Sequence, residues 1–511
     1  MTRVVAVGLV GALALALVAG APAGPTGAAV AASAEHPPDP PTDRIGWEGG
    51  YWHNESIAVD PSDGLDDAEM DAYVSRTMAR VEYVRQQEFT ADVPVSVQSR
   101  ASYREQAADR GTNTSHSAWN DQVWEALWIV GESASANAKI GDVYGTSVAG
   151  FYSPADDEIK IITPDPAHPV ITHATLSHEL THALQDQHHD LTDPAYTGQT
   201  QDGDLAVNGL VEGEANYVQA VYERRCGGAW SCVDVRSGGS GGGGSGDGPN
   251  PGILLTVLQP YSDGPVWIAD RLDRGGWGAV DAAWADPPVS SEQIIHLTEE
   301  SPEAVTVSDR ARNGWTDFPD QGVNGTDTVG EASIFVMFWY QSAYHGADAV
   351  DPSGLQQTES PYDSYDYESE PSAGWAGDAV RPYHKETANG TAYGYVWKTR
   401  WDTERDAREF RDAYVAVLDA HDARTVNAST YVVPGGDWAD AFRVVREGRT
   451  VTVVNAPTAA ALDDVRPGSA PPPGATEEPP LGSQPGFTAP VALLALALAV
   501  ALAAALRRRV A

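Results

Sequence analysis

Basic residues and cysteines are scarce in this chain of 511 residues. Lys and Arg together number 32 against 72 Asp and Glu, which gives a formal net charge of -40. No basic patch is available to neutralise phosphate groups, so the composition disfavours nucleic acid as a partner. The only cysteines are Cys226 and Cys232, and neither a second Cys pair nor a nearby His pair completes a four-ligand zinc site with them. We expect a disulfide between them, worth ~2 kcal/mol.

Lysine is the scarcest charged residue, and the sequence has only Lys139, Lys160, Lys385 and Lys398. A large excess of carboxylates keeps a protein hydrated and soluble in very high salt, where the repulsion between them is screened. The composition therefore indicates a halophilic archaeon as the host. The alternative is an ordinary acidic surface.

Apolar runs long enough to be considered as membrane spans occur only at the two ends of the chain. The apolar stretch at 330–344 is too short to span a bilayer. Residues 1–34 combine Arg3, an apolar run and a series of small residues, which is typical of a signal peptide for export. Residues 488–511 contain an uncharged apolar run that ends in three arginines. This pattern predicts a transmembrane segment with everything before it outside the cell, and a buried core helix is the alternative.

Just before this segment stand Pro485, Gly486 and Phe487. The tripeptide, apolar helix and arginine cluster together resemble the PGF-type C-terminal sorting signal of archaeal surface proteins. The resemblance implies a sorting enzyme that cuts near the tripeptide and a lipid anchor that replaces the helix. Residues 466–487 are rich in Pro, Gly and Glu, where that family has a Thr-rich stalk. We expect a protein anchored at the outer face of the cell membrane and, from five N-x-S/T sequons, a glycoprotein. The sequons are at Asn54, Asn113, Asn324, Asn389 and Asn427.

The central motif is the stretch SHELTHALQDQHHD, which starts at Ser177. It holds His178, Glu179 and His182 in the HExxH arrangement of zinc metallopeptidases. Two histidines four residues apart share one face of a helix and can bind the same metal, while the glutamate can reach a water on it. We therefore predict zinc as the cofactor, His178 and His182 as ligands and Glu179 as the catalytic base.

Zinc needs a third protein ligand, and several residues compete for this role. His188 has the spacing of the third metzincin ligand, but Gln185 stands where that pattern has a helix-breaking glycine. On an unbroken helix His188 points away from the metal, and His189 lies roughly 16 Å along the axis. Within VEGEAN the sequence resembles the gluzincin class, whose third ligand is a glutamate on a following helix. The resemblance implies Glu212 as this ligand.

Two neighbours of Glu212 bear on this choice. Asn216 occupies the position where the gluzincin pattern has an aspartate that orients a ligand histidine, and its amide oxygen can accept the same imidazole N–H. Glu214 is ~200° away from Glu212 on a helix, so we expect it to be exposed or paired with another residue. Candidates for stabilising an oxyanion, by residue type alone, are Tyr152, Tyr217, Tyr222 and His296.

The pattern of apolar residues predicts an α+β fold with two lobes. A flexible leader (35–64) precedes a zincin-like lobe (65–300) in which a hairpin at 149–163 comes directly before the active-site helix. This lobe has a strand near Phe89–Gln98, short helices at 102–109, 121–132 and 253–272, and a Gly/Ser loop (237–252). A second α+β lobe (301–465) contains a buried helix at 330–344 and a helix at 403–421 that covers an antiparallel sheet.

These observations favour a cell-surface zinc metallopeptidase that hydrolyses peptide bonds of extracellular proteins by Glu-assisted attack of zinc-bound water. One alternative is a catalytically inert zincin-like protein with a structural or adhesive role on the cell surface. Another is a hydrolase that uses the same site on a non-peptide bond, because fold and metal do not fix the substrate.

Overall fold

The structure is a computed structural model that describes residues 38–108, 113–235 and 248–468. The predicted export signal, sorting motif and membrane segment lie outside these ranges, as do most of the predicted stalk and of the Gly/Ser loop. Within the described ranges, no helix combines the length and the apolar character that crossing a bilayer requires. Most helices precede residue 300 and the seven-stranded sheet follows it, so the fold class is α+β, as predicted.

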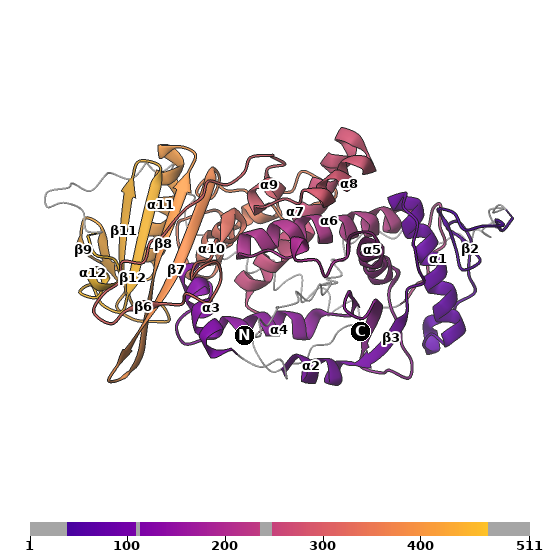
Figure 1. The fold of residues 1–511 in the computed structure, drawn as a ribbon, viewed down its shortest axis with the longest axis horizontal. Coiled ribbons are helices and arrows are strands. Elements are labelled where there is room, and N and C mark those ends of the chain that lie inside the picture. The colour runs from indigo at the N-terminus through magenta and orange to yellow at the C-terminus, as the bar shows by residue number, and fades with distance from the viewer. Residues whose placement is uncertain (1–37, 109–112, 236–247, 469–511) are drawn as a thin grey trace, which may run out of the picture. The chain divides into compact units, whose positions relative to one another are not determined.

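The part of the chain before residue 300 is mainly helical, with a small sheet whose strands follow the order β3-β5-β4 (Figure 1). Its strands are β3 (Val95–Ser99), β4 (Gly150–Ser153) and β5 (Glu158–Thr163). Its helices are α1 (Asp67–Arg85), α2 (Arg100–Ala108), α3 (Thr114–Ala126), α4 (Ala136–Ser147), α5 (His173–His189), α6 (Gln201–Arg225), α7 (Pro251–Gly275), α8 (Trp277–Ala285) and α9 (Ser291–Ile295).

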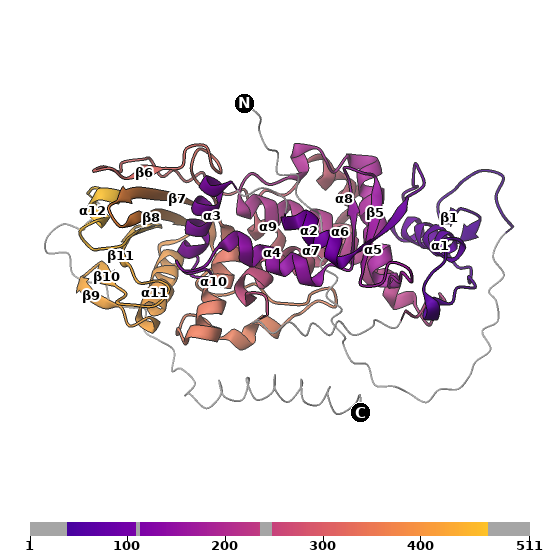
Figure 2. The ribbon, with the colours of Figure 1, turned by 90° about the horizontal axis from the view of Figure 1, so that it is seen from below.

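The hairpin predicted before the active-site helix is confirmed as β4 and β5, which pair antiparallel. β3 pairs in parallel with the other side of β5, and it begins directly after Pro94. Proline cannot donate to a ladder, which suits the outer position of this strand. Ile159 and Ile161 of β5 pack in one apolar cluster with Leu176 and Leu180 of α5, so this sheet supports the HExxH helix (Figure 2).

Part of the leader that was expected to be flexible is folded. β1 (Trp47–Glu48) and β2 (Tyr51–Trp52) form a short hairpin against α1. The backbone N–H of Gly46 donates to Glu82 Oε2 of that helix at 2.8 Å, and Trp52 is buried. Composition alone missed this contact because only a few residues of the leader make it.

Two helix predictions need correction. The helix expected at 121–132 is α3, which starts at Thr114 because the side chain of Asn113 caps it, and which ends at Ala126. The helices expected around 253–272 are one 25-residue helix, α7, which continues through Pro260 and Pro265. Each proline removes an intrahelical hydrogen bond, but packing against the neighbouring helix can outweigh such local costs.

Helices α6 and α7 lie side by side at very short range (Figure 1). A Cβ atom added to Gly213 of α6 would lie 2.6 Å from the carbonyl carbon of Gly264 in α7. A Cβ atom on Gly264 would in turn lie 2.6 Å from the backbone oxygen of Gly209. Only glycine allows the two backbones to approach so closely. This approach determines which side chains of α7 face α6.

The part of the chain after residue 300 contains an antiparallel sheet with the strand order β6-β7-β8-β12-β11-β10-β9. Its strands are β6 (Thr316–Asp317), β7 (Trp375–Thr387), β8 (Gly390–Trp401), β9 (Arg424–Asn427), β10 (Thr430–Val432), β11 (Ala441–Glu447) and β12 (Thr450–Ala456). Its helices are α10 (Gly330–His345), α11 (Glu404–Ala420) and α12 (Leu462–Val465). The predicted antiparallel sheet, its covering helix α11 and the buried helix α10 are confirmed, whereas β6, β9 and β10 were not predicted.

The largest apolar cluster crosses the boundary predicted at residue 300. It joins buried residues of α3 and α7 with α10, α11 and the large sheet, and the Trp128 indole N–H donates to the Tyr414 hydroxyl of α11 at 3.0 Å. The predicted disulfide between Cys226 and Cys232 is confirmed. The helical part and the sheet therefore share their largest apolar cluster, while each also has a smaller cluster of its own.

Candidate metal centre

The HExxH motif lies in the middle of α5. Thr172 caps the helix start by accepting a hydrogen bond from the backbone N–H of Thr175, and Asp190 ends it in a left-handed conformation. No break occurs at Gln185, so the helix continues to His189 as the sequence analysis assumed. His178 and His182 consequently share one face of α5, one turn apart.

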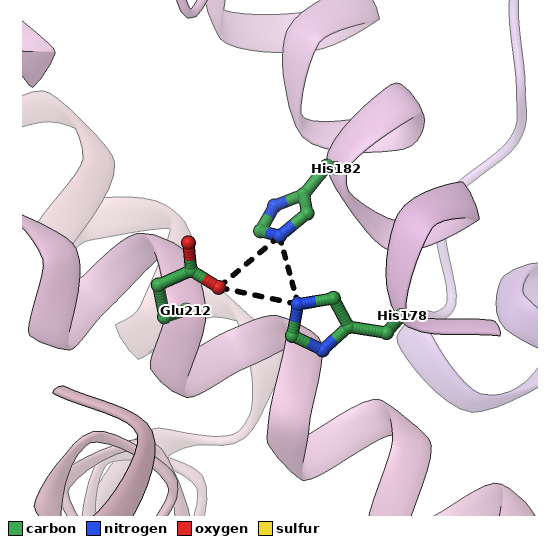
Figure 3. Close-up of side chains that lie close together, drawn as sticks. All are labelled: His178, His182 and Glu212. Carbon is green, nitrogen blue, oxygen red and sulfur yellow. Dashed lines mark hydrogen bonds and ion pairs between the residues drawn. The ribbon is translucent and has the colours of Figure 1, made fainter. Parts of the chain in front are cut away.

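Glu212 comes from the middle of α6, a long helix that Thr200 caps by accepting from the backbone N–H of Gly203. One oxygen of this carboxylate, Oε2, lies 3.2 Å from Nε2 of His178 and 3.2 Å from Nε2 of His182. The two imidazole nitrogens are 3.0 Å apart, so the three donor atoms form a nearly equilateral triangle (Figure 3). We call these three residues the metal cluster.

The geometry of the metal cluster can be compared with a zinc site. Donor atoms ~2.1 Å from a tetrahedral zinc ion are separated by ~3.4 Å, and catalytic sites use three protein ligands from the set His, Glu, Asp and Cys. The observed separations of 3.0 and 3.2 Å come within a few tenths of an ångström of this value. Two imidazole nitrogens and one carboxylate oxygen therefore fit zinc in number, type and spacing.

Further hydrogen bonds fix the orientation of both imidazoles. His182 donates from Nδ1 to Oε1 of Gln185 at 2.8 Å, and Gln185 donates in turn to the carbonyl of Val211 at 2.9 Å. Asn216 hydrogen-bonds the His178 side chain, while its own amide N–H donates to the backbone carbonyl of Tyr261 at 3.1 Å. Partners of this kind hold ligand histidines in the tautomer whose Nε2 lone pair faces a metal.

Glu179 faces the small sheet. Its Oε2 accepts a hydrogen bond from the backbone N–H of Tyr152 in β4 at 2.8 Å, whereas its Oε1 is buried and has no hydrogen-bond partner. Burial raises the pKa of Glu179 to about 8. An unpartnered buried carboxylate oxygen is costly in a finished fold, and a water held between it and a metal would satisfy it. This orphaned oxygen is the second feature that fits a metal at the cluster.

The electrostatics of the metal cluster attract positive charge. Burial alone would raise the pKa of Glu212, but its ion pairs with His182 and His178 outweigh burial and hold this pKa well below its usual range. Burial lowers the pKa of His178, while the nearby Glu212 carboxylate raises that of His182 to about 9 in spite of burial. A charged carboxylate between two histidines is thus the state that the surroundings favour, and a divalent cation requires the same state of Glu212.

The competing ligand candidates make other contacts. Glu214 is buried and paired with Arg85 at 2.5 Å, and it also accepts from the Trp284 indole at 2.8 Å. His188 hydrogen-bonds the carbonyl of Glu88, and the His189 ring stacks on Trp284 with a centroid distance of 4.3 Å. These three residues hold α5 and α6 in place within the helical part.

The structure also places the residues that had been considered as oxyanion donors. Tyr222 accepts from Arg80 at 2.8 Å, the Tyr217 ring packs on Tyr362, and His296 pairs with Glu331 at 2.9 Å. The Tyr152 hydroxyl donates to Asp186. Of these four residues, Tyr152 hydrogen-bonds the HExxH motif, through its backbone N–H, which donates to Glu179.

Tyr261 of α7 was missed by the sequence analysis. Its ring is nearly parallel to that of His178, at 11° and a centroid distance of 6.3 Å, and its hydroxyl hydrogen-bonds Glu212. Burial and then the Glu212 charge raise its pKa well above the usual range. Tyr261 lies 49 positions after Glu212, in a helix that contains two prolines. No sequence pattern relates two residues at this spacing.

The metal cluster and Glu179 are shielded from solvent. His178 and Glu212 are each 3% exposed, while Glu179 and His182 are fully buried. β4 is the outer strand of its sheet, and Glu179 occupies the hydrogen-bonding position of Tyr152 on it.

Comparison with known proteins reaches only one part of the chain. Residues 318–466 match a family described as "Domain of unknown function (DUF8575)". This range contains strands β7 to β12 of the large sheet and helix α10, and it does not include the metal cluster at positions 178–212. No curated protein and no solved structure matches the chain.

Proposed function

We propose that this protein is a zinc metallopeptidase of gluzincin type, with His178, His182 and Glu212 as zinc ligands. The single observation that carries the proposal is the triangle of donor atoms, 3.0 to 3.2 Å apart, contributed by the two consecutive helices α5 and α6. When bound, zinc would polarise a scissile carbonyl and acidify water. The zincin-like character of the helical part belongs to the same proposal.

The residues around the triangle have definite tasks in this proposal. Glu179 is the base, since its buried Oε1 has no hydrogen-bond partner and is available to accept a proton. Gln185 and Asn216 hold the histidines, and Tyr261 positions Glu212. The free edge of β4 can pair with an extended peptide once Glu179 releases the Tyr152 N–H.

The cellular setting is proposed from the sequence alone. The acidic composition suits a halophilic archaeon. The two terminal segments suit export followed by anchoring at the outer face of the cell membrane. Mass spectrometry of the mature protein tests this setting. A chain that begins near Glu35 and ends near the 485–487 motif with a lipid attached is the expected result, whereas an intact terminal segment contradicts processing by a sorting enzyme.

One observation favours a second function, an inert zincin-like surface protein whose zinc is structural. All four residues of the site are at most 3% exposed, and a structural zinc site is typically closed to solvent. The free oxygen of Glu179 argues for the enzyme instead, because a purely structural site has no need of a base beside it.

Zinc content and peptide hydrolysis of the full-length protein in high salt separate these functions. The variants are Glu212→Gln, Glu179→Gln and the control Glu223→Gln, an exposed residue on the same helix as Glu212. We expect one zinc per chain in all but Glu212→Gln, and cleavage of a broad peptide library by the parent and the control only. Zinc without cleavage of peptides or simple amides by the parent supports the structural function, and a parent without zinc overturns both.

A further inference from the structure

A second group of metal-binding side chains lies away from the metal cluster, between α3 and the large sheet. One oxygen each of Glu125, Glu132 and Asp440 lie within 4.8 Å of one another. Glu125 comes from α3, Glu132 from the loop after it, and Asp440 from the residue just before β11. We call these three residues the carboxylate cluster.

The carboxylate cluster has no basic counterpart. Among the described residues, no Lys, Arg or His forms a salt bridge with any of its members, although Glu125 and Asp440 are each only 3% exposed. Burial and mutual repulsion raise the pKa of Glu125 above its usual range and that of Asp440 to about 8. Buried carboxylates without a basic counter-ion are disfavoured in their charged form, so a positive charge at this place would stabilise that form.

Two buried amides next to the carboxylate cluster point to a cation independently. Gln122 donates to Glu125 Oε2 at 2.6 Å, and Asn455 donates to Asp440 Oδ2 at 2.8 Å. With their N–H groups turned to the carboxylates, both amide oxygens are left buried and without a hydrogen-bond partner. Gln122 is 4% exposed and Asn455 fully buried. Each unpartnered oxygen is an acceptor, and a metal ion is one group that would satisfy such acceptors.

The surroundings leave room for an ion and its water. Gln122 and the carboxylate cluster line a cavity of about 640 Å³, which also contains Asp121 and is bounded by Tyr393 of β8. The backbone N–H of Glu132 donates to the carbonyl of Asp437 at 2.9 Å, so the loop is already held against the sheet. The cavity is large enough for waters that complete a coordination shell.

We propose that the carboxylate cluster and the amide oxygen of Gln122 bind one calcium ion, which fastens α3 and the following loop to the large sheet. Calcium takes six to eight oxygen ligands at ~2.4 Å from carboxylates, amide carbonyls and water, so ligand oxygens up to ~4.8 Å apart fit one ion. Magnesium demands a tighter octahedron at ~2.1 Å, and zinc prefers nitrogen and sulfur ligands. The site would use residues from both the helical part and the DUF8575 match.

Terbium luminescence on the full-length protein, at constant high monovalent salt, tests this site. Terbium is the calcium substitute, and Tyr393 at the cavity can sensitise it. High salt screens weak binding to surface carboxylates. We expect a saturable signal that calcium displaces at a concentration at least tenfold lower than magnesium. A parent without a saturable signal overturns the site, and equal displacement by magnesium overturns the choice of calcium.

Two nearly isosteric variants and one control assign the signal to these residues. Glu125→Gln and Asp440→Asn each remove a buried charge, so both should fold without calcium at least as well as the parent, and both should bind terbium at least tenfold more weakly. The control Glu447→Gln removes an exposed charge from β11 and should bind like the parent. Calcium should raise the melting temperature of parent and control but not of the two variants. An equal rise in Glu125→Gln contradicts the proposal.

Discussion

Gln185 accepts a hydrogen bond from His182 Nδ1 at 2.8 Å and thereby turns the Nε2 of that histidine towards Glu212. The same side chain donates to the carbonyl of Val211, the residue before Glu212. A single amide therefore connects the HExxH helix to the helix that carries the third donor. In the sequence this position was notable only because it lacks the glycine of the metzincin pattern.

Replacing Gln185 tests this connection. Gln185→Leu keeps a similar volume but removes both hydrogen bonds, so zinc affinity should fall roughly 10–100-fold, as is typical when the partner of a ligand histidine is lost. Gln185→Glu retains an acceptor for His182 and should lose less. Competition with a chromogenic chelator measures both. Parent-like affinity in Gln185→Leu would show that the histidine is held by other contacts.

The close crossing of α6 and α7 predicts a strong effect of one methyl group. In Gly213→Ala the new Cβ would lie 2.6 Å from backbone of Gly264, so the helices must separate, at a cost of about 1–3 kcal/mol in the free energy of unfolding. Gly278→Ala in α8 is the matched control, because a Cβ there meets nothing within 4 Å and alanine favours helix. Denaturant unfolding of both variants measures the difference, and equal stability would contradict the crossing as described.

The sequence predicted the parts of the candidate site that depend on helical spacing. His178, Glu179 and His182 sit within five residues, where the geometry of one helix fixes their relation, and Glu212 entered through its resemblance to a family pattern. Tyr261 could not be predicted, because its place depends on how α7 packs on α6 through Gly213 and Gly264. Such tertiary contacts leave no periodic signal in a single sequence.

The fold shows the same division between local and long-range information. The β4–β5 hairpin and helix α11 were predicted because alternation and amphipathic periodicity are local. The sequence predicted two lobes that divide at residue 300, but the largest apolar cluster crosses this boundary. Apolar residues of α3 pack there with α10 and the large sheet. Composition also missed β1 and β2, whose stability comes from contacts with α1.

Asp202 predicts a pH-dependent stability with a definite sign. It is 1% exposed and accepts from the backbone N–H and hydroxyl of Ser291, and burial raises its pKa from the ordinary 3.8 to about 7. At a pH between these two pKa values, Asp202 is protonated in the native state and has released its proton in the unfolded state. Stability contributed by this residue therefore falls as pH rises from ~4 to ~7, by up to ~1.4 kcal/mol per pH unit.

Asp202→Asn removes this titration and keeps an oxygen that can accept from Ser291. Its free energy of unfolding should depend less steeply on pH than that of the parent over this window, and it should exceed that of the parent near pH 7. Asp71→Asn, an exposed substitution on α1, controls for the loss of one charge. Denaturant unfolding at constant salt from pH 4.5 to 7.5 gives the slopes. Identical slopes in parent and Asp202→Asn would place the proton elsewhere.

Removing the metal should separate the ligands from the base in thermal unfolding. Binding at a thousand times the dissociation constant stabilises a native state by ~4 kcal/mol, which corresponds to a shift of roughly 4–5 °C in the melting temperature of a chain of this size. A zinc chelator should therefore lower the melting temperature of the parent and of Glu179→Gln by this amount, and added zinc should restore it. Glu212→Gln should not respond, because two histidines alone bind zinc weakly. A full response in Glu212→Gln would move the third ligand away from α6, whereas a missing response in Glu179→Gln would make this residue a ligand instead of the base.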